Sequence, residues 1–77
     1  DEIVLLDDDA LCRGMVVAFD RLKFSLEAAG SAVLAALAGP LKGRLTGKRT
    51  AAILCGSNID EASWQQLIER GRSSQPT

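Results

Sequence analysis

Apolar residues recur at helical spacing in three stretches of the chain. In the first stretch, positions 11, 15, 18 or 19, and 22 are apolar, which predicts a helix from about Asp8 to Leu22 with one apolar face. The second stretch, Ala28–Ala38, consists mainly of alanine and leucine, and Gly39–Pro40 ends it because proline cannot continue a helix. In the third, Trp64, Leu67 and Ile68 form an apolar stripe behind Asp60, which predicts a capped helix.

Two short runs carry apolar residues on both faces instead of one. Glu2–Leu6 lies before the first predicted helix, and Thr50–Leu54 lies before the third. Such runs are typical of buried strands in a sheet that helices cover on both sides. The predicted order is strand, helix, helix, strand, helix, which is an α/β pattern. Two strands of about five residues do not form a self-sufficient sheet, so we expect an incomplete flank of a larger three-layer α/β/α domain.

The composition also favours a piece of a larger protein. Hydrophobic residues make up 47% of the 77 residues and the mean hydropathy is +0.10, which is high for so small a core. Some of this apolar surface is therefore expected to meet another part of a protein. The chain starts almost directly in an apolar run and without methionine, so we expect a segment of a longer protein.

Charge and cysteine content exclude several classes of function. The net charge is -1 with both signs interspersed, which gives no basic surface for nucleic acid. No apolar run approaches the roughly 20 residues that cross a membrane. Two cysteines, Cys12 and Cys55, and no histidine form neither a disulfide scaffold nor a zinc site. We expect a reducing, cytoplasmic setting, with Cys12 as a structural residue of the first helix.

The stretch Ala51–Asp60, "AAILCGSNID", carries the strongest functional signal. An apolar run stops at a cysteine, and a Gly–Ser–Asn turn leads into a helix. Together with "LEAAGSAVLAAL" upstream and "LIERG" downstream, this stretch resembles the C-terminal part of the threonine and serine dehydratases. These are pyridoxal-phosphate enzymes of fold type II, the tryptophan synthase β-like group. The resemblance covers nearly the whole chain and makes residues 1–72 the C-terminal part of a catalytic domain, with residues 73–77 as a flexible tail.

The resemblance implies roles for four residues at the cofactor pyridoxal 5'-phosphate. Cys55 takes the place of the family's Ser or Cys beside the pyridine nitrogen, and Gly56 lets the backbone pass close to the cofactor ring. Asn58 would fix the turn, and Glu27 matches an acidic residue that comes near the same ring edge. Ser57 departs from the family, which usually has a second glycine at that position.

The resemblance assigns catalysis to the complete enzyme and not to this segment alone. Lys23, Lys42 and Lys48 lack the family's motif for the Schiff-base lysine, and no glycine-rich phosphate loop is present. No catalytic residue is therefore assigned here. The implied partners are the remainder of the enzyme chain, which we expect to be a homo-oligomer, and an amino-acid substrate. Threonine, serine, 3-hydroxyaspartate and a racemase reaction all stay open.

Other interpretations of the same residues remain. Cys55 is compatible with an ordinary buried thiol, and "CGSN" with a phosphate-binding turn at a helix N-terminus. Glu27, Asn58 and Asp60 are compatible with plain turn and cap roles, and residues 7–9 with a solvated helix cap. The alternative function is a stand-alone small α/β module that binds a partner without catalysis. A compact chain would favour such a module, and an exposed apolar edge would favour the segment of an enzyme.

Overall fold

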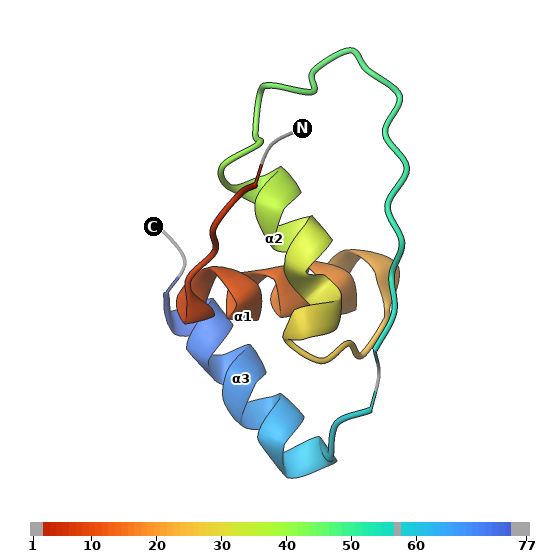
Figure 1. The fold of residues 1–77 in the computed structure, drawn as a ribbon. Helices are drawn as coiled ribbons and strands as arrows, with labels where there is room; N and C mark the ends of the chain where they lie inside the picture. Colours follow the sequence, from red (N-terminus) through yellow and green to blue (C-terminus); the bar gives the residue numbers. More distant parts are fainter. Residues whose placement is uncertain (1–2, 57, 75–77) are drawn as a thin grey trace.

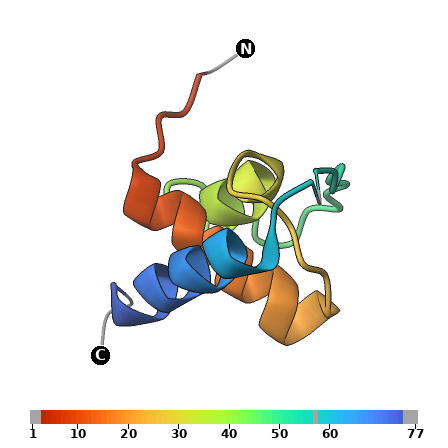
Figure 2. The ribbon, with the colours of Figure 1, turned by 90° about the horizontal axis from the view of Figure 1, so that it is seen from below.

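The computed structural model describes residues 3–56 and 58–74, and α1 is at the centre of the fold. α1 spans Asp8–Val17 and continues into a π-helical turn, η1, over Ala18–Leu22. A short 3-10 turn, η2, over Ala29–Ser31 leads into α2, Ala32–Ala38, and α3 spans Glu61–Ser73. α1 lies between α2 and α3 and contacts both (Figure 1), and the view from below shows α3 alongside α1 (Figure 2). The three predicted helices are confirmed.

Side chains and turns at the helix ends account for these boundaries. Asp7 Oδ1 accepts a hydrogen bond from the Ala10 N–H at 2.7 Å, and Asp60 Oδ2 accepts one from the Ser63 N–H at 3.0 Å. Each carboxylate thereby satisfies an amide that has no partner inside the helix. η1 ends where Lys23 turns left-handed, with φ 63°. The predicted cap roles at residues 7–9 and at Asp60 are confirmed.

Two glycines let α1 approach its neighbours. A Cβ at Gly14 would lie 2.7 Å from the carbonyl oxygen of Ser31 and 3.0 Å from the Cβ of Ala35. A Cβ at Gly71, on α3, would collide with the carbonyl group of Cys12. Backbone therefore packs on backbone on both sides of α1, which leaves no room for a side chain at either glycine.

The hydrophobic core lies between α1 and α3. Met15, Val16 and Ile68 form its buried centre, and Trp64 packs against them together with Ala28 and Leu67. The Trp64 ring also meets the edge of Phe19, with ring centroids 4.9 Å apart and planes at 70°. The prediction that Trp64, Leu67 and Ile68 face the core is confirmed.

Two ion pairs also join α3 to α1 and η1. Arg70 Nε donates to Asp9, and both guanidinium nitrogens of Arg72 donate to the carboxylate of Asp20, at 2.8 and 2.9 Å. The hydrogen bonds from Arg72 lower the pKa of Asp20 below its ordinary value. All four side chains are about half exposed, so water and salt screen these pairs.

We expect the ion pair of Asp20 to contribute to acid sensitivity. Because the pKa of Asp20 is lower in the folded chain, its contribution to stability is present above the unfolded pKa, about 4, and is lost as the pH falls through the folded pKa. Asp20→Asn should therefore be less stable than the wild type at about pH 6 and equally stable at about pH 2. Urea unfolding at both pH values measures this difference.

Arg72→Gln is the matched control for this prediction. It removes the donor, so it should give the same pH profile as Asp20→Asn. The double variant should be no less stable than either single variant, because both remove one interaction. Additive losses would instead mean that the two residues act independently.

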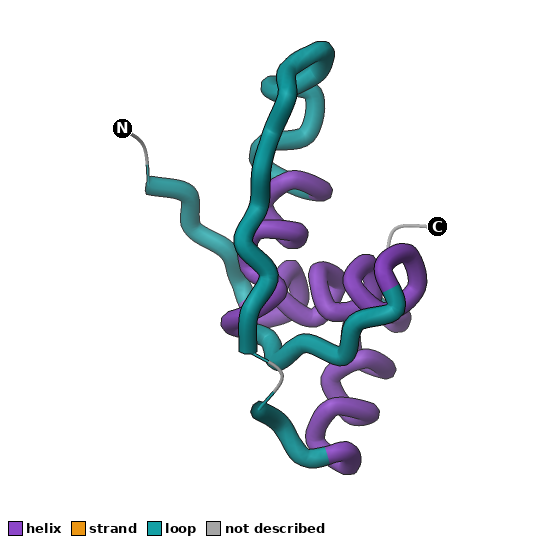
Figure 3. The backbone as a smooth tube through the Cα atoms, turned by 90° about the vertical axis from the view of Figure 1, so that its right-hand side faces the viewer, coloured by secondary structure: helices purple, strands orange, loops and turns teal. Residues whose placement is uncertain are grey.

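The two runs predicted as strands are extended in the structure, and no strand is formed among residues 3–56 and 58–74. Residues 3–7 precede α1, and residues 49–56 belong to the long segment that returns from the end of α2 towards α3 (Figure 3). Ile3, Leu5 and Ile53 are 89, 87 and 85% exposed, so the burial predicted for these runs is not found within this chain. The α/β/α arrangement therefore stays a prediction. Glu2 lies outside the described residues.

Candidate functional site

Three of the four predicted cofactor-binding residues lie together where two separate segments meet. The turn before η2 carries Glu27, and the end of the long extended segment carries Cys55 and Gly56. The Glu27 N–H donates a hydrogen bond to the carbonyl oxygen of Gly56 at 2.6 Å. This bond joins two segments that are far apart in the sequence.

The shape of this junction depends on Gly56. Its φ of +87° is in the left-handed region, which a residue with a side chain rarely adopts. A Cβ at this position would also lie 3.0 Å from Cγ of Glu27 and would collide with its Oε1. The Glu27 side chain therefore lies directly against the Gly56 backbone.

Gly30 completes the junction, and the sequence interpretation did not single it out as a site residue. A Cβ at Gly30 would collide with the carbonyl oxygen of Cys55, and it would lie 3.1 Å from that of Gly56. In the sequence, Gly30 stands among small residues in "LEAAGSAVLAAL", and nothing there identifies its contact partner.

The two cysteines differ in their environments. Cys12 is 2% exposed within α1, which confirms its structural role, whereas Cys55 is exposed. The structure therefore does not support the interpretation of Cys55 as an ordinary buried thiol. A small hollow of ≈ 220 Å³ adjoins it. Its lining residues are Phe24, Ser25, Leu26, Leu54, Cys55 and Gly56.

Thiol reactivity should separate the two cysteines. Burial is the main cause that raises the pKa of the Cys12 thiol, so less of its reactive thiolate is present at neutral pH. We expect a disulfide reagent to modify Cys55 at least about tenfold faster than Cys12 in the folded chain. Mass spectrometry of the digested product at short times measures both rates.

Unfolding is the control for this measurement. In about 6 M urea both cysteines are exposed, so their rates should become similar. Equal rates in the folded chain would contradict the burial of Cys12.

Asn58 is exposed on the segment that leads into α3, and the structure does not place it in the junction. Its predicted role in fixing the turn stays a prediction. Ser57, where the sequence departs from the dehydratases, lies outside the described residues.

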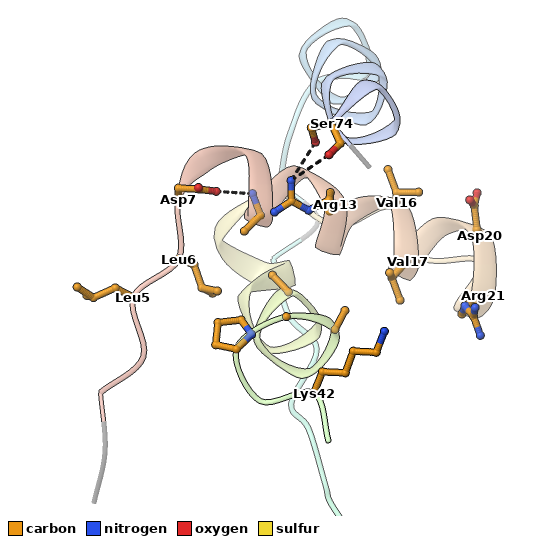
Figure 4. Close-up of a pocket in the computed structure, with 15 residues that line it drawn as sticks. Leu5, Leu6, Asp7, Arg13, Val16, Val17, Asp20, Arg21, Lys42 and Ser74 are labelled. Atoms are coloured by element: carbon orange, nitrogen blue, oxygen red, sulfur yellow. Dashed lines mark hydrogen bonds between the residues drawn. The ribbon is translucent and has the colours of Figure 1, made fainter. Parts of the chain in front are cut away.

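A larger hollow of ≈ 770 Å³ lies between the extended residues before α1, the α1–η1 helix and the end of α2. Figure 4 shows its lining, with Leu5 and Leu6 on one wall and Val16 and Val17 on another. The hollow is open and mixes apolar and charged side chains.

Three of the five charged side chains that line this hollow have structural partners. Asp7 caps α1, Arg13 donates to the carbonyl and hydroxyl oxygens of Ser74, and Asp20 pairs with Arg72 (Figure 4). The lining contains no cysteine, serine–base pair or histidine that would supply a nucleophile. The junction of Glu27 with Cys55 and Gly56 is therefore the stronger candidate site.

Two further observations limit the kinds of site. Over residues 3–56 and 58–74, no group of three or more metal-ligating side chains comes together. In the same part of the chain, none of the helices has the length and apolar character to cross a membrane.

Comparison with known proteins gives two relatives. The chain is 41% identical over 71 residues to phenylserine dehydratase of Ralstonia pickettii, a match that covers 92% of the chain and 22% of that enzyme. It is 37% identical over 71 residues to L-threonine ammonia-lyase of Geobacter sulfurreducens, with 92 and 17% covered. No protein-family model and no solved structure matches the chain.

The chain spans about a fifth of the length of the curated relatives it matches. The two matches nevertheless cover 92% of the chain, including Glu27, Cys55 and Gly56. The resemblance seen in the sequence is confirmed, and the chain is homologous over almost its whole length to a segment of the threonine and serine dehydratase-like enzymes.

Proposed function

We propose that this chain forms the ring-nitrogen side of the cofactor site in a pyridoxal-phosphate-dependent dehydratase. The complete enzyme would eliminate water and ammonia from a hydroxy-amino acid and release a 2-oxo acid. The names of the two relatives, a dehydratase and an ammonia-lyase, support this reaction class. The remaining length of the enzyme would supply the lysine and the phosphate loop that this chain lacks.

The observation that carries the proposal is the contact between Glu27 and the Cys55–Gly56 turn. These residues were selected from the resemblance to the dehydratases alone, and the fold brings them within hydrogen-bonding distance.

The residues at the junction fit the cofactor. The thiol of Cys55 is exposed, the neighbouring Gly56 has no side chain, and the adjoining hollow is largely apolar, as one edge of an aromatic ring requires. Cys55, Gly56 and Glu27 would hold that edge, with Asn58 stabilising the turn. When bound, the cofactor supplies an electron sink for the elimination.

The chemistry of Cys55 suits a mild electron sink. A protonated thiol forms only a weak hydrogen bond to a ring nitrogen and brings no negative charge to it. The thiol would therefore orient the ring but would not keep the ring nitrogen protonated. An aspartate at this position would keep it protonated. The side chain of Glu27 packs against Gly56, and the backbone hydrogen bond between these two residues would fix the position of Glu27 relative to the ring.

Absorbance spectroscopy tests the proposal. The chain is expressed within its longer reading frame and titrated with pyridoxal 5'-phosphate, beside the 77-residue chain. We expect a visible band of bound cofactor in the longer product alone, and release of a 2-oxo acid from threonine, serine or 3-hydroxyaspartate. A longer product that binds no cofactor would contradict the proposal and favour a binding module without catalysis. A change in substrate chirality without elimination would instead identify a racemase.

Substitution of Cys55 should separate orientation from charge at the ring. Cys55→Ser keeps a neutral hydrogen-bonding group, so cofactor affinity in the complete enzyme should stay close to that of the wild type. Cys55→Ala removes the hydrogen bond and should weaken binding by about 2- to 10-fold. Cys55→Asp introduces a carboxylate and should change the absorbance spectrum of the bound cofactor.

Cys12→Ala is the control for the Cys55 series. It removes a thiol that is buried in α1, so it should lower the melting temperature without changing the cofactor spectrum. Identical spectra for wild type, Cys55→Ala and Cys55→Asp would place Cys55 away from the ring.

We further propose that the extended segments complete a sheet in the parent enzyme. Exposed apolar side chains at residues 3, 5 and 53 support this arrangement, because a sheet with helices on both faces would cover them. The remainder of the enzyme chain would supply the neighbouring strands.

A further inference from the structure

We propose that Gly30 is a positioning residue for the Cys55–Gly56 turn, which would contact the cofactor ring. This role rests on the proposed function. Gly30 has no side chain to touch the cofactor and would act through the Cys55–Gly56 turn. The turn that carries Gly30 would set the distance between the Cys55–Gly56 turn and the cofactor ring.

The contacts at Gly30 show why the position of the turn depends on it. The Gly30 backbone lies against the carbonyl groups of both Cys55 and Gly56, so a Cβ would collide with one and lie 3.1 Å from the other. The Glu27 N–H, three residues earlier, holds the Gly56 carbonyl at 2.6 Å. The turn is therefore fixed by a hydrogen bond on one side and by a backbone contact on the other.

The backbone around Gly30 is itself fixed to α1. The next residue, Ser31, is fully buried, and its hydroxyl donates to the carbonyl oxygens of Leu11 at 3.0 Å and Ala28 at 2.8 Å. The segment that carries Gly30 cannot withdraw from α1 without breaking the hydrogen bond from Ser31 to Leu11. An added methyl group at Gly30 would therefore move the Cys55 turn, and the Cys55 thiol with it.

The expected size of the effect follows from the geometry. An added methyl group that moves the Cys55 thiol would weaken its hydrogen bond to the ring, and loss of such a bond weakens binding by about 2- to 10-fold. Gly30→Ala would otherwise be neutral or favourable for the short helical turn, because alanine has the higher helix propensity. A loss in this variant would therefore arise from the contact with the Cys55 turn.

The test measures cofactor binding in the complete enzyme for Gly30→Ala and for Ala29→Ser. Ala29 is the neighbouring, exposed residue of η2, and serine there also adds a single heavy atom. We expect Gly30→Ala to weaken pyridoxal-phosphate affinity by about 2- to 10-fold, as for Cys55→Ala, and to change the absorbance or fluorescence of the bound cofactor at saturation. Ala29→Ser should change neither quantity.

A nuclear Overhauser spectrum of the unsubstituted 77-residue chain supplies a second readout that needs no cofactor and no variant. Contacts from the Gly30 α-protons to the backbone of Gly56 are expected, and their absence beside intact α1–α3 contacts would overturn the inference. Wild-type affinity and spectrum in Gly30→Ala would overturn it too, while leaving the proposed function intact. A wild-type enzyme that binds no cofactor would overturn both.

Discussion

Replacement of Met15 by alanine should remove a large part of the free energy of unfolding. Met15 is 0% exposed at the centre of the α1–α3 core, and truncation of such a side chain costs about 2 to 5 kcal/mol. A domain of 77 residues has a total stability of about 4 to 12 kcal/mol. The loss is therefore a large fraction of the free energy of unfolding.

Urea unfolding followed by circular dichroism measures this prediction. Met15→Leu is the volume-conserving control and should cost less than about 1.5 kcal/mol. Leu5→Ala is the exposed control, because its side chain is 87% accessible and should change the free energy of unfolding by less than about 0.5 kcal/mol. Similar losses for Met15→Ala and Leu5→Ala would show that the α1–α3 core is not the main source of stability.

The helices could be predicted because their signals are local. Apolar spacing around Met15, the caps at Asp7 and Asp60, and the Gly39–Pro40 stop each act within a few residues. The π-helical turn at residues 18–22 and the left-handed Lys23 were not predicted, because they change only how the helix ends.

The two runs predicted as strands have no neighbouring strand among the described residues. Glu2–Leu6 and Thr50–Leu54 have the apolar pattern of strands, but a strand needs hydrogen bonds to a neighbour in a sheet. Residues 39–56 instead form one long segment without helix or strand, which is uncommon in compact domains at lengths above about 15 residues. The apolar pattern of these two runs therefore predicts strands only where a neighbouring strand is present.

The site could be predicted in part. The resemblance to the dehydratases selected Glu27, Cys55 and Gly56, and the structure brings these three residues together. Gly30 could not be selected from spacing, because its contact partner depends on how the long segment folds back. A glycine that fits against another backbone leaves no polar or apolar signal in a single sequence.

Replacement of Gly56 by alanine should have the largest effect on the cofactor site in the complete enzyme. Gly56 has φ +87°, and an added Cβ would also collide with the Glu27 carboxylate. Left-handed strain costs about 1 to 3 kcal/mol, and displacement of Glu27 adds to that cost. We expect cofactor affinity to fall by about 10- to 100-fold, as measured by titration of the apoenzyme with pyridoxal 5'-phosphate.

Gly43→Ala separates the two causes of this loss. Gly43 has almost the same backbone angle, φ +85°, but nothing lies within 4 Å of the Cβ that alanine would add. Both variants therefore carry similar backbone strain, and only Gly56→Ala meets Glu27. A lower melting temperature in both variants, with loss of cofactor affinity in Gly56→Ala alone, would locate the effect at the junction of Gly56 with Glu27. Equal affinities would show that this junction does not hold the cofactor, because strain alone cannot distinguish the two glycines.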